Sequence, residues 1–102
     1  MNQFILMGRL VRDPEKKNSE NPVTRYTLAV DKNFGKDTEF LSCVVFGKEA
    51  EFAQKYLHKG SKILVQGRIE NRFHEKNEKK IYVTDLIVEH QEFCESKKSE
   101  VK

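Results

Sequence analysis

Residues 38–50 limit what this chain can fold into more than any other segment, because apolar alternation there turns into helical spacing within one uninterrupted run. Successive side chains of a strand point to opposite sides. One face is apolar and small enough to pack as a core, and it comprises Leu41, Cys43 and Val45. The opposite face carries two large rings, and it comprises Phe40, Ser42, Val44 and Phe46.

Two interpretations fit this segment equally well. Spaced aromatic rings on a second face need a partner, and flat rings suit nucleobases stacked one after another. A strand buried on both faces of a β-sandwich would show the same pattern. The rest of the chain has to distinguish them.

Four further strands and one helix are predicted from hydrophobic spacing and turn residues. The strands are residues 3–12, 23–31, 62–72 and 81–89, and the helix is residues 48–57. Gly67 is expected to mark a bulge or bend where a small barrel turns a corner. Three strands, a helix and two strands are the order of an all-β OB-fold, a five-stranded Greek-key barrel with one helix between strands 3 and 4. A split sheet with the helix on one side is the alternative.

The predicted connections are polar. A loop follows the first strand over residues 13–22, and a charged hairpin joins the last two strands over residues 73–80. The chain forms one domain over residues 1–93, followed by a short polar tail, 94–102, that we expect to be disordered.

Several classes of function lack support in the composition. The two cysteines, Cys43 and Cys94, form neither a disulfide framework nor part of a Cys/His cluster, so no metal and no cofactor is expected. Histidines and aspartates are dispersed along the chain, which argues against an enzyme. The first residues show no basic leader and no long apolar run, so we expect a cytoplasmic protein without a membrane span.

The net charge is only +3, so the placement of the basic residues matters more than their number. All five arginines fall in or at the ends of predicted strands: Arg9, Arg12, Arg25, Arg68 and Arg72. Three lysines lie in turns or at the helix start near the aromatic residues: Lys32, Lys36 and Lys48. Arginine held on a sheet contacts phosphate at two points, whereas loop lysines attract it diffusely. Arginines that merely solubilise a half-exposed sheet are the alternative.

Six segments in the same order and spacing resemble bacterial single-stranded DNA-binding proteins, and the resemblance covers nearly all of residues 1–93. They read NQFILMGRLVRDPE (2–15), YTLAV (26–30), FLSCVVFGK (40–48), YLHKGS (56–61), VQGRI (65–69) and YVT (82–84). The resemblance implies sequence-independent binding and protection of single-stranded DNA during replication, recombination or repair. It also implies base stacking by Phe34, Phe40 and Phe46, and by a hairpin residue that is either Phe73 or His74.

The chain departs from the family in two respects. It has no tryptophan, so stacking should be weaker than in members that use this residue. It also lacks the acidic, Phe-terminated tip through which family members recruit replication and repair proteins, as expected of a short member or of a truncated chain. An OB-fold protein-interaction module, such as a primosome accessory factor, is the alternative function, and a cold-shock-like RNA binder is a third.

The first strand predicts self-association. Its second face is apolar at Ile5, Met7 and Val11, and a lone barrel has no layer to cover it. Symmetric pairing of two first strands would bury that face and satisfy the strand edge. The resemblance implies the same contact and a homotetramer, and a cytoplasmic, nucleoid-associated protein.

Overall fold

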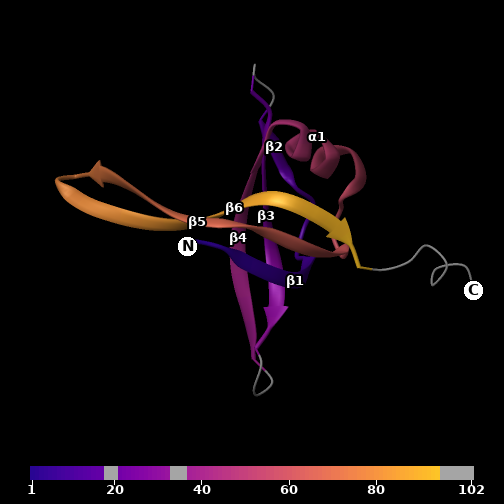
Figure 1. Ribbon diagram of the computed structural model, residues 1–102. Coiled ribbons are helices and arrows are strands. Elements are labelled where there is room, and N and C mark those ends of the chain that lie inside the picture. The colour runs from indigo at the N-terminus through magenta and orange to yellow at the C-terminus, as the bar shows by residue number, and fades with distance from the viewer. Residues whose placement is uncertain (18–20, 33–36, 95–102) are drawn as a thin grey trace, which may run out of the picture.

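The computed structural model describes residues 1–17, 21–32 and 37–94, without the side chain of His74. The elements are β1 (Phe4–Leu10), β2 (Glu15–Lys17), β3 (Val23–Asp31), β4 (Thr38–Phe46), α1 (Gly47–Tyr56), β5 (Lys62–Lys76) and β6 (Lys79–Phe93). They form one sheet in the order β1-β5-β6-β4-β3-β2, and β3 also pairs with β1. Five strands therefore close into a ring, with α1 between the third and fourth of them (Figure 1). The predicted OB-fold is confirmed.

The prediction of a continuous loop over residues 13–22 is wrong. Glu15–Lys17 form the short strand β2, which pairs with β3 outside the ring, Glu15 opposite Arg25 and Lys17 opposite Val23. All three residues of β2 are exposed. The segment contains no apolar residue that would signal a strand. It is a strand because its backbone pairs with the open edge of β3.

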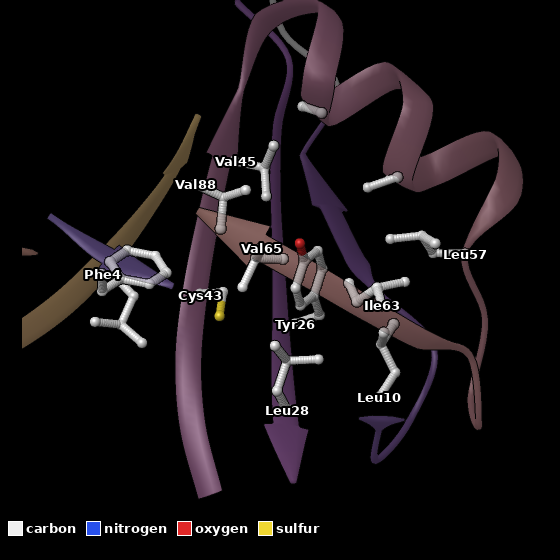
Figure 2. Close-up of a cluster of buried hydrophobic side chains, with 13 residues drawn as sticks. Phe4, Leu10, Tyr26, Leu28, Cys43, Val45, Leu57, Ile63, Val65 and Val88 are labelled. Carbon is white, nitrogen blue, oxygen red and sulfur yellow. The ribbon is translucent and has the colours of Figure 1, made fainter. Parts of the chain in front are cut away.

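The core fills the ring as the alternation predicts. Its buried residues are Phe4, Leu10, Tyr26, Leu28, Cys43, Val45, Ala50, Ala53, Leu57, Ile63, Val65, Leu86 and Val88. Phe4 lies at one end of this cluster in Figure 2, and Leu57, just after α1, lies at the other. The helix thus covers one opening of the barrel with small side chains.

Polar contacts join α1 to the strands beneath it. Thr24 on β3 donates a hydrogen bond to the carbonyl oxygen of Ala50 over 3.1 Å. Gln91 on β6 donates to the carbonyl oxygen of Glu49 over 3.0 Å and to its carboxylate over 2.9 Å. Because all these groups are at least partly buried, each missing bond would leave a polar atom unpaired.

Gly47 makes the turn from β4 into α1. Its φ is +68°, in the left-handed region that glycine adopts without a steric penalty. Its amide donates to the carbonyl oxygen of Pro22 over 3.1 Å, which ties the turn to the start of β3. This backbone change leaves Phe46 at the strand–helix junction.

Gly67 marks the predicted bulge. The register of β5 with β6 shifts between Gln66 and Gly67. A Cβ atom on Gly67 would lie 1.8 Å from the carbonyl oxygen of Ile87, so no other residue fits this close approach. The prediction is confirmed.

The hairpin of β5 and β6 is longer than predicted. The strands continue to Lys76 and from Lys79, and the two turn residues Asn77 and Glu78 have φ of 56° and 65°. Both central residues with positive φ match the twist of a tight hairpin. Figure 1 shows the hairpin projecting well beyond the ring. The sequence did not predict this length, because most residues of the hairpin are exposed and it lacks the apolar alternation of a half-buried strand.

Backbone pairing continues one residue past the end of β6. The amide of Cys94 donates to the carbonyl oxygen of Lys62 over 2.9 Å and so prolongs the pairing of β5 with β6. The rest of the predicted tail, residues 95–102, lies outside the described residues.

Candidate nucleic-acid interface

The two rings of β4 lie on the outer side of the barrel. Phe40 is 65% exposed and Phe46 is 49% exposed. They are six positions apart along the strand, a distance of about 20 Å. Both rings are therefore available to a ligand, and they are too far apart to contact each other.

Val44, which shares a face of β4 with these rings, is buried. Val44 is only 2% exposed although it lies on the same side of β4. It is opposite Arg25 on β3 and opposite Ile87 on β6, and Ile87 is buried as well. The surface between the two rings thus contains a small apolar floor outside the main core.

Three arginines share this side of the sheet. Arg25 lies opposite Val44, Arg68 lies opposite Ile87, and Arg72 follows on β5 with the same alternation. We call this side the outer face and define it by Phe40, Phe46, Arg25, Arg68 and Arg72. The structure brings these predicted residues together from three strands.

A buried carboxylate connects two of the arginines. Arg72 Nε donates to Oδ2 of Asp85 over 2.5 Å. Arg25 Nη1 lies 3.8 Å from Oδ1 of the same residue. Asp85 is on β6, and no sequence motif singled it out.

Arg68 has two exposed acidic partners. Its Nε donates to Glu70 over 2.9 Å and its Nη1 donates to Glu89 over 2.7 Å. These hydrogen bonds, first to Glu70 and then to Glu89, raise the pKa of Arg68 above its ordinary value. The guanidinium therefore stays charged, but one of its terminal nitrogens already donates to Glu89.

Arg12 lies close to the outer face, whereas Arg9 does not. A shallow cleft brings Arg12 next to Arg25 and Ser42. Arg9 donates to the carbonyl oxygen of Gly60 over 2.9 Å and lines a different cleft, together with Lys62. The predicted arginines thus form two separate regions.

The predicted lysines differ in their surroundings. The amino group of Lys32 lies 3.5 Å from the carboxylate of Glu39 and 3.9 Å from that of Asp37. Lys48 is exposed in the first turn of α1, two residues after Phe46. Phe34 and Lys36 lie outside the described residues.

The hairpin carries an exposed aromatic pair. Phe73 on β5 is opposite Tyr82 on β6, with ring centroids 5.6 Å apart, and Lys80 lies 5.7 Å from the centre of the Phe73 ring. By strand alternation Phe73 points to the side opposite Arg72. Tyr82 was not among the predicted site residues, although the register of the hairpin places it opposite Phe73. The side chain of His74 lies outside what the structure describes, so the choice between Phe73 and His74 stays open.

The outward side of β1 is exposed where self-association is predicted. Ile5 is 61% exposed, Met7 is also exposed, and Val11 is half-buried. Within the described chain Phe4–Gly8 pair only with β5, because β3 joins β1 at Arg9 and Leu10 alone. One edge of β1 therefore has no strand partner in the described monomer over these residues.

A closed five-stranded ring capped by one helix, with an outer face of exposed rings and arginines, defines an OB-fold binding module. Comparison with known families identifies it further. The chain belongs to the single-strand binding protein family, whose sequence model matches residues 1–94. Membership in a family of binding proteins supports the expectation that the chain is not an enzyme.

Curated relatives share this family. The chain is 38% identical over 108 residues to the single-stranded DNA-binding protein of Halalkalibacterium halodurans, a match that covers 98% of this chain and 64% of the relative. It is 41% identical over 108 residues to the protein of the same name from Fusobacterium nucleatum, with 97% and 70% covered. For Clostridium perfringens the identity is 40% over 101 residues, with 94% and 67% covered. The chain thus spans about two thirds of the length of these relatives.

Among the described residues, no helix has both the length and the apolar character that a membrane span requires.

Proposed function

We propose that this chain binds and protects single-stranded DNA without sequence preference, during replication, recombination or repair. The family match over residues 1–94 and the names of the relatives, single-stranded DNA-binding proteins, support this function. The observation that carries it is the exposure of Phe40 and Phe46 on a face that also holds three arginines. A solvent-exposed face with no ligand would not be expected to keep two large rings, 65% and 49% exposed, beside these arginines.

In this mechanism the rings and the cations do different work. Phe40 and Phe46 each accept the π-face of a base, which every base possesses, so the contact is tolerant of sequence. Arg25, Arg68 and Arg72 contact phosphates, which carry no sequence information. Affinity then comes from several modest contacts rather than from one.

Further predicted contacts extend the proposed path of the bound DNA. From Arg25 this path continues to Arg12 along the cleft that both arginines line. Lys48 adds a positive charge beside Phe46, and Lys32 adds one at the end of β3, together with Phe34 and Lys36. Arg9 and Lys62 offer a second basic region. The hairpin contributes a stacking residue, Phe73 or His74.

We also propose a homotetramer built from dimers that pair through β1. Exposed Ile5 and Met7 and the open edge over Phe4–Gly8 support a symmetric strand pairing. Four barrels would let one DNA strand contact several sites, which raises the effective concentration of each contact. The compartment proposed for this assembly is the cytoplasm, in association with the nucleoid.

The test of this function is fluorescence anisotropy with end-labelled oligonucleotides of equal length. We expect tight binding to oligo(dT) and to mixed-sequence single strands, and much weaker binding to the corresponding duplex. Preference for oligo(rU) would favour an RNA binder instead. Absence of binding to every nucleic acid would contradict the proposal and favour the protein-interaction module.

A further inference from the structure

Asp85 is a buried carboxylate on a face that we propose to bind a polyanion. Its side chain is 3% exposed, whereas its two cationic neighbours, Arg25 and Arg72, are 41% and 47% exposed. The negative charge therefore lies beneath the guanidinium groups, and those groups form the surface above it.

The surroundings of Asp85 are apolar as well as basic. Ile87 lies two residues further along the same side of β6, and Val44 lies opposite Ile87 on β4. Both are buried, so little water reaches the carboxylate to screen it. A carboxylate buried in this way is stable only when cations compensate it.

The contacts of Asp85 with the two arginines are unequal. Oδ2 accepts the hydrogen bond from Arg72 Nε. Oδ1 accepts no hydrogen bond from the described residues, and it faces Arg25 Nη1 at 3.8 Å. The hydrogen bond to Arg72 uses the nitrogen nearest the chain, so it leaves the two terminal nitrogens of that guanidinium as donors for another ligand.

We propose that Asp85 is a positioning residue, which holds Arg72, and through charge Arg25, in place to receive phosphates of single-stranded DNA. The inference rests on the proposed function. A guanidinium that is already oriented loses less side-chain freedom when it binds phosphate than a free arginine would. Asp85 itself never touches the ligand.

Charge alone predicts the opposite sign. Removing a carboxylate from a DNA-binding face should strengthen binding to a polyanion, because it removes repulsion. Removing a residue that orients two arginines should weaken binding. The two accounts therefore differ in direction and not merely in size.

Glu89 offers the matched control. It also pairs with an arginine of the outer face, but it is exposed and accepts from a terminal nitrogen of Arg68, where a phosphate would bind. Glu89→Gln should leave oligo(dT) affinity unchanged or raise it. Asp85→Asn has the same change in charge and should lower the affinity by about 2- to 10-fold for each arginine that it orients.

The experiment is a titration of labelled oligo(dT) at several NaCl concentrations with wild type, Asp85→Asn and Glu89→Gln. The log–log salt slope of Asp85→Asn should match wild type, because both arginines remain, while its affinity falls at every salt concentration. Asp85→Asn should also change the affinity much less in a background that carries both Arg25→Ala and Arg72→Ala, because neither arginine is then left for Asp85 to orient. A loss that persists there would indicate a general distortion and would overturn the inference.

A second variant covers the case in which Asp85→Asn does not fold. Arg72→Lys keeps the charge at an exposed site, but it replaces the separate Nε and terminal nitrogens of the guanidinium with one ammonium nitrogen, so the terminal donor pair oriented by the hydrogen bond to Asp85 is lost. It should bind nearly as weakly as Arg72→Ala, and binding close to wild type would overturn the inference. If wild type binds oligo(dT) and Asp85→Asn binds as tightly or more tightly, the positioning role fails and the proposed function stands. If wild type does not bind, both fail.

Discussion

Tyr26 on β3 donates a hydrogen bond to Gln91 on β6 through the interior of the barrel, with 2.8 Å between Oη and Oε1. Gln91 in turn donates to Glu49 at the start of α1. One buried amide therefore connects two strands that are not neighbours in the sheet with the helix that covers them.

Tyr26→Phe should lower the free energy of unfolding by about 1–3 kcal/mol, because it leaves the buried Oε1 of Gln91 without its donor while the ring still fills the core. Urea unfolding measures this loss. Tyr56→Phe, which removes a hydroxyl from an exposed ring, is the control and should have almost no effect. Equal stability of Tyr26→Phe and wild type would contradict a structural role for this bond.

Stability should fall at alkaline pH. Burial raises the pKa of Cys43 from 9.0 to about 12, and burial, with Cys43 and Glu49 adding to it, raises the pKa of Tyr26. The unfolded chain therefore loses these protons first, and the fold loses stability relative to it as pH rises above the unfolded pKa of each group, 9.0 for Cys43 and 10.0 for Tyr26. Above that pH each group contributes up to about 1.4 kcal/mol per pH unit.

Cys43→Val should make the decline between pH 9 and 10 less steep, since it removes one of the groups responsible. Urea unfolding at a series of pH values, under reducing conditions, measures the slope. Cys94→Val controls for thiol chemistry in general. A Cys43→Val slope equal to wild type would mean that other groups dominate the alkaline transition.

Phe46→Ala should weaken oligo(dT) binding and leave the barrel folded, because about half of the ring is exposed. The loss of one stack is roughly 1–3 kcal/mol, or about 5- to 150-fold in affinity. Phe40→Ala should behave similarly, and Tyr56→Ala on α1 is the matched control. Unfolding of Phe46→Ala would make this ring part of the core, and normal binding would remove it from the site.

Salt should weaken binding steeply. A plot of log affinity against log NaCl should be linear, with a slope of about −0.7 for each phosphate neutralised on a single strand. Arg72→Ala and Arg25→Ala should each flatten this line, whereas Lys55→Ala removes a positive charge from α1 and should not. An affinity independent of salt would eliminate the electrostatic part of the mechanism.

Ile5→Lys should dissociate the proposed assembly, because a charge at 61% exposed Ile5 would be buried on pairing of two β1 strands. Sedimentation velocity at micromolar concentration measures the mass of each species. Ile81→Lys, the same change on the hairpin, should leave the mass unaltered. A monomeric wild type, or an oligomer that resists Ile5→Lys, would contradict pairing through β1.

Local patterns were enough to predict most of the framework. The bounds of β3 follow from alternation, because every second residue from Thr24 to Leu28 faces the core. Gly67 marks the predicted bulge, at a place where a Cβ atom does not fit. The order of the elements was sufficient to indicate the OB-fold.

Closure of the ring decided the rest. Val44 lies on the same side of β4 as the exposed rings of Phe40 and Phe46, yet it is buried between Arg25 and Ile87 on the neighbouring strands. Asp85 has an ordinary acidic side chain in the sequence, and only the pairing of β6 with both β4 and β5 brings it between Arg25 and Arg72. The sequence by itself determined which residues line each face of each strand, since that depends on local backbone geometry. Which of those residues meet across the outer face depends on strand pairing between distant segments, and the tertiary structure alone determined that.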